Sequence, residues 1–449
     1  MFVKSLPLLS GRLLLALSAI FFLLTFGSFS SAQAQSLSKE DRERARIMLE
    51  SAKDDIKKNY YDPTFRGMDL EARFLEAKEK INKATSNGQM FGIIAQLMLD
   101  LKDSHTFFLP PPRAASVEYG WQMQMIGDKC YVVAVKPGSD AEAKGLKPGD
   151  LIQSVVGYTP SRDSLWVLQY LLYTLRPQGG LQVVAQSPGA AQPRQLELLA
   201  KVGPTKRVID LASFEGSDYF DLIREAENEA RVNAHRYYEM GDEVFLWKMP
   251  QFDMPKTQVD DMMDKVKKRK ALILDLRGNG GGSEETMLRL IANLVDHDVT
   301  IGELKRRKET KPLVAKTRGE NVFKGKVVVL VDSRSGSASE VFSRVMQLEK
   351  RGTVIGDRTA GAVMRSRSYD HRIGTDVVVY YGTSVTDADV IMSDGASLEG
   401  VGVTPDELKL PTATDMAAGR DPVLARAFEL IGMKIDAEKA GTLFPVRWK

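Results

Sequence analysis

Two short stretches decide how this chain folds: LDLRGNGGG at residues 274–282 and SGSASE at residues 335–340. Each comes directly after an apolar run, residues 271–274 and 327–331, and this pattern predicts a buried parallel strand. A helix-like segment follows each stretch. Because parallel strands end at the same edge of a sheet, we expect both turns where open α/β sheets carry their chemistry. A serine there, close to free backbone N–H groups, indicates an acyl-transfer site.

The chain has 449 residues, too many for one ordinary domain, so two or three domains are expected. Its hydrophobic content of 43% and charged content of 27% are those of a globular protein. The first 34 residues hold two of the 62 basic side chains and none of the 59 acidic ones, which leaves the rest with a net charge of about +1. That balance gives no indication of nucleic-acid binding.

The first 34 residues have the pattern of a secretion signal. Lys4 and Arg12 precede an apolar stretch, residues 13–29, and the sequence AQA at residues 32–34 matches a signal-peptidase site. We expect cleavage after Ala34 and export to a periplasm. An uncleaved membrane anchor is the alternative. The chain has one cysteine and therefore no internal disulfide, which fits a bacterial periplasm.

Residues 37–112 are predicted to form a helical domain. Three sets of apolar residues recur at helical spacing, and the last of them leads into Ser104 and His105 before the prolines at residues 110–112. His105 is therefore expected at or just past a helix end, where its side chain can project away from the helices.

Residues 115–202 change character to short strands and turns. The glycine-rich run at residues 138–152 resembles part of a PDZ domain. This resemblance implies that Tyr119, Gly120 and Trp121 form the loop that binds a peptide carboxylate, while the peptide adds as a strand to the sheet edge. The alternative is a PDZ fold that serves only as a packed lid.

Ser337 is the candidate nucleophile. It follows a strand and begins a helix, so the N–H of Ala338 and the helix N-terminus are positioned to stabilise an oxyanion. Gly281 or Gly282, where the absence of a side chain allows close backbone approach, is expected to supply the second donor. The alternative is a small-residue turn with a capping serine. The glycine run lacks the Gly-Lys-Ser/Thr ending of a phosphate-binding P-loop.

Together with GDRTAG at residues 356–361, these motifs resemble the C-terminal processing (tail-specific) serine peptidases and their relatives, including the tricorn core. The resemblance extends from the helical region to residues 405–406. It implies a serine peptidase with Ser337 as the nucleophile. The processing-peptidase branch pairs its serine with a lysine in the turn after Gly361, whereas residue 362 of this chain is Ala362.

No lysine occurs between residues 350 and 409, so the lysine dyad is absent from its expected place. The tricorn-core branch uses a histidine that follows a serine, and Ser104 and His105 match that pattern. In that branch an acid orients the base, and Glu399 fits its position. The predicted catalytic residues are therefore Ser337, His105, Ser104 and Glu399, which would act as a serine triad does. The alternative is that His105 is a surface or capping residue and Glu399 a solvated acid.

The other three histidines are weaker candidates for the base. His235 and His297 have the charged surroundings of surface residues, and His371 is the reserve candidate. No pair of histidines has the spacing of metal ligands, so neither a metal nor another cofactor is expected.

The expected fold class is an α/β catalytic core of layered sheets, of the ClpP/crotonase kind, with an N-terminal helical cap and an inserted β-rich PDZ domain. Residues 219–236 are predicted to form a helix at the start of the core. The expected divisions are a signal peptide (1–34), a helical domain (37–112), a PDZ domain (115–202), the α/β serine peptidase core (204–411) and a helical tail (412–449).

These patterns favour an exported serine endopeptidase that cuts envelope or periplasmic proteins through an acyl-enzyme and binds their carboxyl ends with its PDZ domain. The expected partners are protein or peptide substrates, with membrane contact only through an uncleaved signal segment, and oligomerisation is left open. Two alternatives belong to other classes: a peptidase-fold protein that has lost its chemistry and only binds, and a scaffold that recruits a partner. The missing lysine favours the first of these.

Overall fold

The computed structural model describes residues 37–113, 115–204, 232–375 and 378–448. The predicted signal segment, residues 1–34, lies outside these ranges, as does most of the helix predicted over residues 219–236. Residue 236, the last of that stretch, begins strand β9 (Arg236–Met240). Among the described helices, none combines the length and the hydrophobicity that a membrane span requires.

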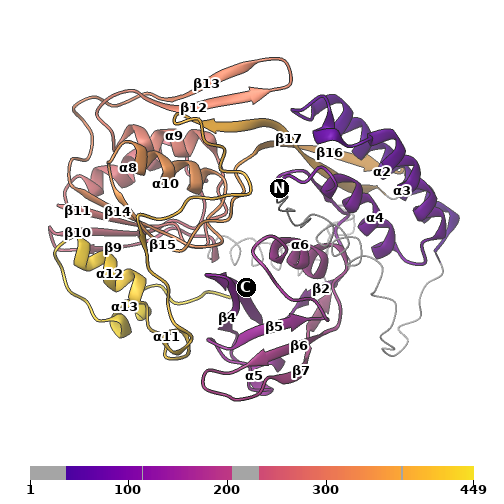
Figure 1. Cartoon of the computed structure of the whole chain (residues 1–449), viewed down its shortest axis with the longest axis horizontal. Helices are drawn as coiled ribbons and strands as arrows, with labels where there is room; N and C mark the ends of the chain where they lie inside the picture. The colour runs from indigo at the N-terminus through magenta and orange to yellow at the C-terminus, as the bar shows by residue number, and fades with distance from the viewer. Residues whose placement is uncertain (1–36, 114, 205–231, 376–377, 449) are drawn as a thin grey trace, which may run out of the picture.

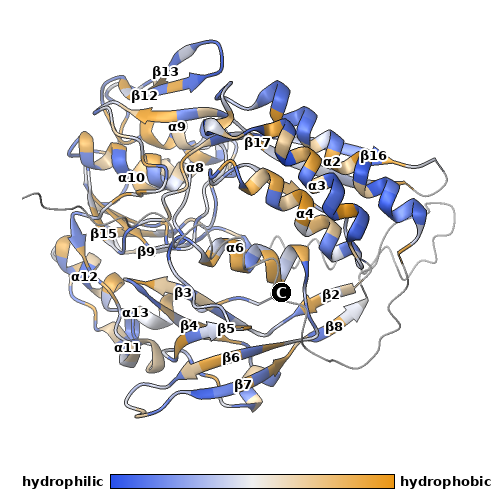
Figure 2. Cartoon of the chain, turned by 45° about the vertical axis from the view of Figure 1, so that its right-hand side comes forward, coloured by the Kyte–Doolittle hydropathy of each residue, from blue (hydrophilic) through white to orange (hydrophobic). Residues whose placement is uncertain are grey.

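The first described region is helical, as the apolar spacing predicts. Its helices are α2 (Lys39–Asn59), α3 (Leu70–Lys83) and α4 (Asn87–Leu99). A serine or aspartate side chain caps the first turn of each one, which satisfies a backbone N–H that the helix leaves unpaired. Their buried faces share one hydrophobic core, and α4, which is packed on several sides, is hydrophobic over most of its length (Figure 2).

A second region forms a five-stranded antiparallel sheet in the order β3-β4-β5-β6-β7. The strands are β3 (Trp121–Ile126), β4 (Lys129–Val135), β5 (Leu151–Val155), β6 (Gly180–Gln186) and β7 (Arg194–Leu199). The short helix α5 (Asp140–Ala143) follows β4, and α6 (Leu165–Gln169) runs into a π-helical turn, η2 (Tyr170–Leu175). Because β3 pairs only with β4, it forms an edge of this sheet.

The third region is built on a six-stranded sheet in the order β18-β15-β14-β11-β10-β9. The strands besides β9 are β10 (Val244–Lys248), β11 (Ala271–Asp275), β14 (Lys326–Val331), β15 (Thr353–Gly356) and β18 (Glu407–Leu408). These five run parallel, and β9 pairs antiparallel with β10. The two apolar runs predicted as buried parallel strands are therefore confirmed as β11 and β14, which pair directly with each other.

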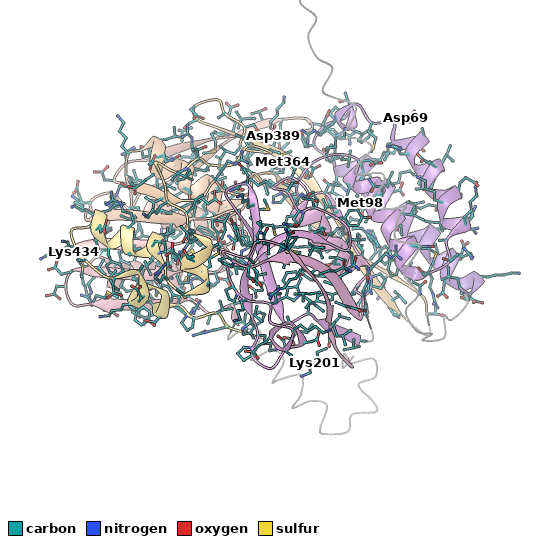
Figure 3. All side chains as sticks on the ribbon, turned by 60° about the horizontal axis from the view of Figure 1, so that its bottom comes forward. Asp69, Met98, Lys201, Met364, Asp389 and Lys434 are labelled. Atoms are coloured by element: carbon teal, nitrogen blue, oxygen red, sulfur yellow. The ribbon has the colours of Figure 1, made fainter. Side chains whose placement is uncertain are left out.

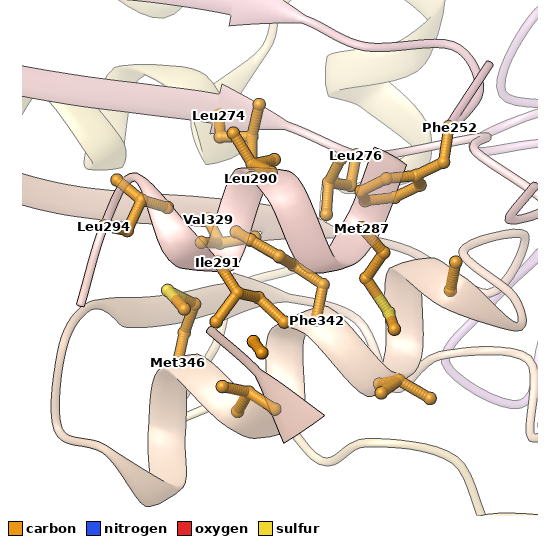
Figure 4. Packing of buried hydrophobic residues seen from close by; sticks show 14 of the residues in the cluster. Phe252, Leu274, Leu276, Met287, Leu290, Ile291, Leu294, Val329, Phe342 and Met346 are labelled. Atoms are coloured by element: carbon orange, nitrogen blue, oxygen red, sulfur yellow. The ribbon is translucent and has the colours of Figure 1, made fainter. Parts of the chain in front are cut away.

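Helices cover both faces of this sheet (Figure 1). One face carries α8 (Lys256–Val266), α9 (Glu284–Ala292) and α10 (Ala338–Leu348), and the other carries α12 (Pro422–Leu430) and α13 (Ala437–Leu443). Figure 4 shows Leu290 and Ile291 of α9 packed with Leu274 and Val329 of the sheet and with Phe342 of α10. Burial of each such side chain contributes roughly 1.5–3 kcal/mol, so the strand ends rest on a rigid layer.

An antiparallel sheet joins the helical region to the six-stranded core. Its path is β1-β17-β12-β13, and β16 also pairs with β17. The strands are β1 (Phe107–Leu109), β12 (Val299–Arg306), β13 (Thr310–Ala315), β16 (Arg365–Ile373) and β17 (Val379–Met392). Tyr381 and Val385 of β17 lie in the core of the helices, whereas Ala388 and Val390 lie in the main core. One long strand thus fixes the helices relative to the six-stranded sheet.

The remaining elements are β2 (Ala115–Glu118), which pairs with β8 (Lys201–Pro204), the single turn η1 (Phe65–Gly67) and α11 (Ala413–Ala417).

Figure 3 shows how far apart the regions lie: Asp69 marks the helices, Lys201 the β-rich region and Lys434 the C-terminal tail, each at a different end of the molecule. The structure thus has an α/β core of mixed sheets, as expected from the sequence.

Candidate active site

Ser337 sits in a strained turn directly before α10. Its backbone has φ +53° and ψ −119°, a conformation that residues other than glycine rarely adopt. The N–H of Ser337 donates to the carbonyl of Ala362 at 2.7 Å and to Oε2 of Glu340 at 3.0 Å. Ser337 is half-buried while Ser335, Ser339 and Glu340 are fully buried. The turn therefore presents this serine and hides its neighbours.

Hydrogen bonds join the serine turn to the glycine turn, as the parallel strands predict. Ser335 donates to the carbonyl of Leu276 at 2.8 Å, and Ser339 donates to the carbonyl of Asn279 at 2.9 Å. The N–H of Gly336 also donates to that Asn279 carbonyl, at 2.9 Å. The two turns are thus held side by side by their own small side chains and backbone.

Only glycine fits at position 281. A Cβ placed there would lie 2.6 Å from Cβ of Ser337 and 3.1 Å from the nitrogen of Ala338, and the backbone has φ +107°. The N–H of Gly281 donates to Oδ1 of Asn279 at 2.8 Å, so this predicted oxyanion donor is engaged within its own turn. Among the described residues, no acceptor is hydrogen-bonded to the N–H of Ala338 or of Gly282. Both amides are therefore free to donate to a ligand.

His105 lies between α4 and β1, past the helix end as expected. The buried carboxylate of Asp103 holds this turn by accepting from the N–H of His105 at 2.9 Å and the N–H of Thr106 at 2.8 Å. Thr386 of β17 donates to the same oxygen at 2.7 Å. Asp103 was not foreseen from the sequence, although an aspartate two residues before a turn amide is a common way to fix it.

The residues predicted as the relay, Ser104, His105 and Glu399, are in contact. Ser104 Oγ lies 2.7 Å from Nδ1 of His105, and it donates to Oε2 of Glu399 at 2.9 Å. The N–H of Ser104 donates to Oε1 of Glu399 at 2.7 Å. Because an ionised Glu399 only accepts, the Ser104 hydroxyl must accept from Nδ1–H of a neutral His105. This tautomer leaves the lone pair of Nε2 free to take a proton.

Burial sets the charge of the relay. It lowers the pKa of the His105 imidazole, and the negative charge of Asp103 offsets this effect only in part. The imidazole is therefore neutral at pH 7, as a general base must be. Burial also raises the pKa of the Glu399 carboxyl above its ordinary value, against the hydrogen bonds that Val363 and Ser104 donate to it.

The segment around Ala362 links the relay to Ser337. The carbonyl of Ala362 accepts from the N–H of Ser337, and the N–H of the next residue, Val363, donates to Oε2 of Glu399 at 2.8 Å. Glu399 in turn holds Ser104 beside His105. A continuous series of hydrogen bonds thus connects residues that lie more than two hundred positions apart.

The other histidines serve elsewhere. Nε2 of His371, the reserve candidate, is 2.7 Å from Oδ2 of Asp55 on α2, so it joins β16 to the helices. His297 is exposed, as predicted, and lies 2.9 Å from Glu349. His235 was predicted to be a surface residue, but it is only partly exposed. The indole of Trp247 donates to its Nδ1 at 3.2 Å. In the described ranges, no group of three or more potential metal ligands occurs.

Charged side chains that are mostly buried hold the glycine turn in place. Arg277 makes paired hydrogen bonds to Asp275 and to Asp421, the residue that caps α12. Lys248 donates to Asp275 at 3.0 Å. Burial alone would raise the pKa of Asp275, but the charges of Arg277 and Lys248 hold it far below the ordinary value. Lys248 and Asp421 lie far from this turn in the sequence, so these contacts could not be predicted from the motif.

The loop expected to bind a peptide carboxylate has its side chains turned inward. Tyr119 is buried, and its hydroxyl donates to the carbonyl of Leu172. Trp121 is buried in the core of the β-rich region. At Gly120, φ is +72° and a Cβ would lie 2.4 Å from Cβ of Ser139. The side chains of Tyr119 and Trp121 are therefore not available to a ligand.

The edge of β3 contacts the serine turn and α6. The Ser333 hydroxyl donates to the carbonyl of Met125, and the Gln124 amide donates to Asp332 at 2.7 Å. The carbonyl of Met123 accepts from Gln169 of α6 at 3.4 Å. The β-rich region is thus joined to the turn that precedes Ser337.

Residues 246–408 match the profile of peptidase family S41. The chain is 28% identical to the tail-specific protease of Haemophilus influenzae over 59% of this chain and 38% of that protein. It is 24% identical to a putative tricorn protease homolog of Streptomyces coelicolor over 84% of this chain and 31% of that protein. It is 25% identical to the chloroplastic C-terminal processing peptidase of Tetradesmus obliquus over 78% of this chain and 74% of that protein.

Among solved structures, mature CPAF has the same fold. It superposes with a TM-score of 0.61 over 84% of this chain and 95% of CPAF, at 14% identity. CPAF complexed with lactacystin gives a TM-score of 0.60 over 84% of this chain and 96% of that one, also at 14% identity. The chain spans less than two fifths of the length of the tail-specific protease and of the tricorn protease homolog.

Proposed function

We propose that this chain, whose core is similar to peptidase family S41, is a serine peptidase with a histidine base. The observation that carries the proposal is the hydrogen-bonded series Glu399–Ser104–His105, joined through Val363 to the turn that holds Ser337. A strained serine beside free amides at the end of a parallel strand adds to its support.

The chemistry follows from these positions. Oγ of Ser337 attacks the carbonyl carbon of the scissile bond while its proton passes to Nε2 of His105. The N–H of Ala338 and an amide of the glycine turn stabilise the oxyanion. The C–N bond then breaks, and His105 returns the proton to the leaving amine. Water repeats the sequence on the acyl-enzyme, which releases the carboxylic acid and restores the Ser337 hydroxyl.

Ser104 and Glu399 stabilise the imidazolium that forms on His105. When Nε2 takes the proton, Ser104 Oγ accepts from Nδ1–H and donates to the half-buried Glu399 carboxylate, whose negative charge stabilises the imidazolium. This is the role of the third member of a serine triad, here through one intervening hydroxyl. Ala362 has only a methyl group where the other branch of the family carries a lysine, so histidine is the base that the site offers.

We further propose that the protein is exported and cuts exported proteins or peptides. The signal pattern of residues 1–34 supports export. The β-rich region, residues 115–202, has an edge strand next to the Ser337 turn, which is in line with capture of a substrate's carboxyl end by strand addition. To add to β3, such a peptide would have to replace the hydrogen bonds that Ser333 and Gln169 donate to the carbonyls of Met125 and Met123.

The competing function is a binding protein on a peptidase fold without activity. The alanine at position 362 favours it, and the intact contacts of Ser104, His105 and Glu399 argue against it. The two functions differ in one measurable property, which is the reactivity of Ser337 toward an acylating or phosphonylating reagent.

The experiment is labelling with a fluorophosphonate probe, followed by peptide mapping in a mass spectrometer. Wild-type protein is expected to carry the probe on Ser337, and the Ser337→Ala variant is expected to carry none. Ser343, whose hydroxyl donates to the carbonyl of Ser339 inside α10, provides a matched control as Ser343→Ala. A folded wild type that stays unlabelled, also with a carboxyl-terminal peptide present, would establish the binding function instead.

A further inference from the structure

The carboxylate of Glu340 is fully buried three residues after Ser337, in the first turn of α10. Its Oε1 accepts from the hydroxyl of Thr359 at 2.6 Å and from the N–H of Gly361 at 2.7 Å. Its Oε2 accepts from the N–H of Ser337 at 3.0 Å and from the N–H of Ala362 at 2.9 Å. Four donors thus converge on one carboxylate.

This arrangement is best satisfied by the ionised form of Glu340. A carboxylate has only acceptors, so both of its oxygens can take two donors each. The O–H of a protonated carboxyl finds no acceptor among the three backbone N–H groups and could point only to the Thr359 hydroxyl, which already accepts from the N–H of Val403 at 2.6 Å. Thr359 would then lose the bond that it donates to Oε1, and the three N–H bonds to the neutral group would weaken.

The bonds of Glu340 join the two halves of the site. On one side they hold the N–H of Ser337, whose φ of +53° needs support from its surroundings. On the other side they hold Gly361 and Ala362. The next residue, Val363, carries the hydrogen bond to Glu399, which orients the relay.

We propose that ionised Glu340 is a positioning residue, which fixes the Ser337 backbone relative to residues 361–363 so that nucleophile and base meet only when this carboxylate is deprotonated. The inference rests on the proposed function, since it assigns a second ionisable group to the same reaction. Glu340 does not touch the reacting atoms, because its oxygens are occupied by backbone and hydroxyl donors.

The surroundings of Glu340 and of His105 shift the pKa values of these two groups in opposite directions. Burial raises the pKa of Glu340 to about 7, which the four hydrogen bonds offset only in part, whereas burial lowers the pKa of His105 below its ordinary value. The charged residues closest in sequence to Glu340 and its partners are Arg344 on α10 and Asp357 and Arg358 before Thr359, and Glu399 accepts from the N–H of Val363. Within the described residues, none of these groups forms an ion pair with Glu340.

These two pKa shifts determine the pH at which reactivity should be lost. As the pH falls through about 7, Glu340 takes up a proton and the segment from Thr359 to Ala362 loosens, while His105 is still neutral. Acylation of Ser337 should therefore decline near pH 7. A site limited by His105 alone would decline only at the lower pH where the imidazole is protonated.

The test is the rate constant of fluorophosphonate labelling of Ser337, measured across about pH 5 to 9 in wild type and Glu340→Gln. Wild type is expected to lose reactivity with a midpoint near 7. The Gln variant has an NH₂ group facing two donors, so its plateau is expected to fall about tenfold because the geometry is relaxed. Its midpoint near 7 is expected to vanish, which leaves only the lower midpoint of His105. A purely structural role would lower stability and leave the midpoint unchanged.

A second pair of variants covers the case in which Glu340→Gln does not fold. Thr359→Val removes a hydroxyl donor from Oε1, so the pKa of Glu340 and with it the midpoint should rise. Thr359→Ser keeps the donor and should keep the wild-type midpoint.

An unchanged midpoint in folded Glu340→Gln overturns the inference, and so does an unchanged midpoint in Thr359→Val. A wild-type midpoint below that of an ordinary histidine overturns it too. These results leave the proposed function intact, provided that Ser337→Ala abolishes labelling. If folded wild type does not label at all, the proposed function fails and the inference fails with it.

Discussion

The nucleophile half and the base half of the candidate site are built in different ways. The nucleophile half consists of two turns that follow the adjacent parallel strands β11 and β14, and bonds between the turns hold them together. The base half brings Ser104 and His105 to Glu399, which lies 295 positions from Ser104 in the chain. The nucleophile half is therefore formed by contacts between neighbouring turns, whereas the base half depends on how the helical region packs against the core.

The docking in this molecule depends on β17. This strand passes from the core of the helices to the main core, and β1, which follows His105, pairs with it. The Ser384 hydroxyl of β17 also donates to the carbonyl of His105 at 2.7 Å. Changes in the nucleophile half should therefore act locally and strongly, while changes in the docking should act on the base half alone.

The largest effect is expected from Gly281→Ala. A Cβ at this position would lie 2.6 Å from Cβ of Ser337 and 3.0 Å from the carbonyl oxygen of Gly336, on a backbone with φ +107°. Displacement of the serine by about 1 Å is expected to lower the labelling rate on the order of 10²- to 10³-fold. Gly280→Ala is the matched control, because nothing lies within 4 Å of its Cβ position. Equal rates for both alanine variants would refute the crowding of this turn.

The second largest effect is expected in the base half, from Glu399→Gln. The amide cannot accept from Ser104 and Val363 as the carboxylate does, so the imidazolium of His105 loses its support. Labelling is expected to fall about 10²-fold, and about tenfold in Ser104→Ala, whose effect passes through one hydroxyl. Loss of the negative charge should also lower the pKa of His105, while the decline near pH 7 that Glu340 sets should remain. Exposed Glu320 serves as the control, as Glu320→Gln.

A smaller effect, on stability rather than on chemistry, is expected from Asp421→Asn. The change removes the charge that pairs with Arg277 below the glycine turn. Urea unfolding should show a loss of about 1–3 kcal/mol, since the hydrogen bonds to a charged partner are weakened in a mostly buried place. Labelling of the folded variant should stay within a few-fold of wild type. A large fall in the labelling rate with unchanged stability would contradict this expectation and would place Asp421 and α12 in the site itself.

The smallest effect is expected from His371→Ala, which tests the docking of the helices. Among the described residues, the variant leaves Asp55 with the Thr383 hydroxyl as its hydrogen-bond partner. Its unfolding free energy is expected to fall by about 1 kcal/mol. His297→Ala, in an exposed ion pair, is the control and should cost less than about 0.5 kcal/mol. Equal losses in both variants would mean that the His371 contact does not hold the helices.

The difference between the two halves also decides what could be predicted from the sequence. The apolar runs before residues 274–282 and 335–340 predicted two adjacent buried strands, and the crowding at Gly281 follows from them. These features depend on short stretches of chain. Ser104, His105 and Glu399 were proposed from a family resemblance, because no local pattern tells which segments will meet across 295 positions.

Other features needed the packed structure. The ionisation of Glu340 depends on donors from residues 359–362, and the N–H of Gly281 is directed to Asn279 by the shape of its turn. The buried positions of Tyr119 and Trp121 follow from the core of the β-rich region rather than from the loop sequence. Each of these features depends on long-range contacts, so the pattern of residue types alone could not predict it.

The most direct test of the account is the hydrolysis rate of a peptide substrate by wild type, His105→Ala and His371→Ala, measured side by side at pH 8. If His105 is the base of a Ser337 nucleophile, its removal should lower the rate on the order of 10³-fold or more. Removal of His371, which contacts Asp55, should leave it within a few-fold. A His105→Ala variant that is folded and nearly as active as wild type would contradict the account.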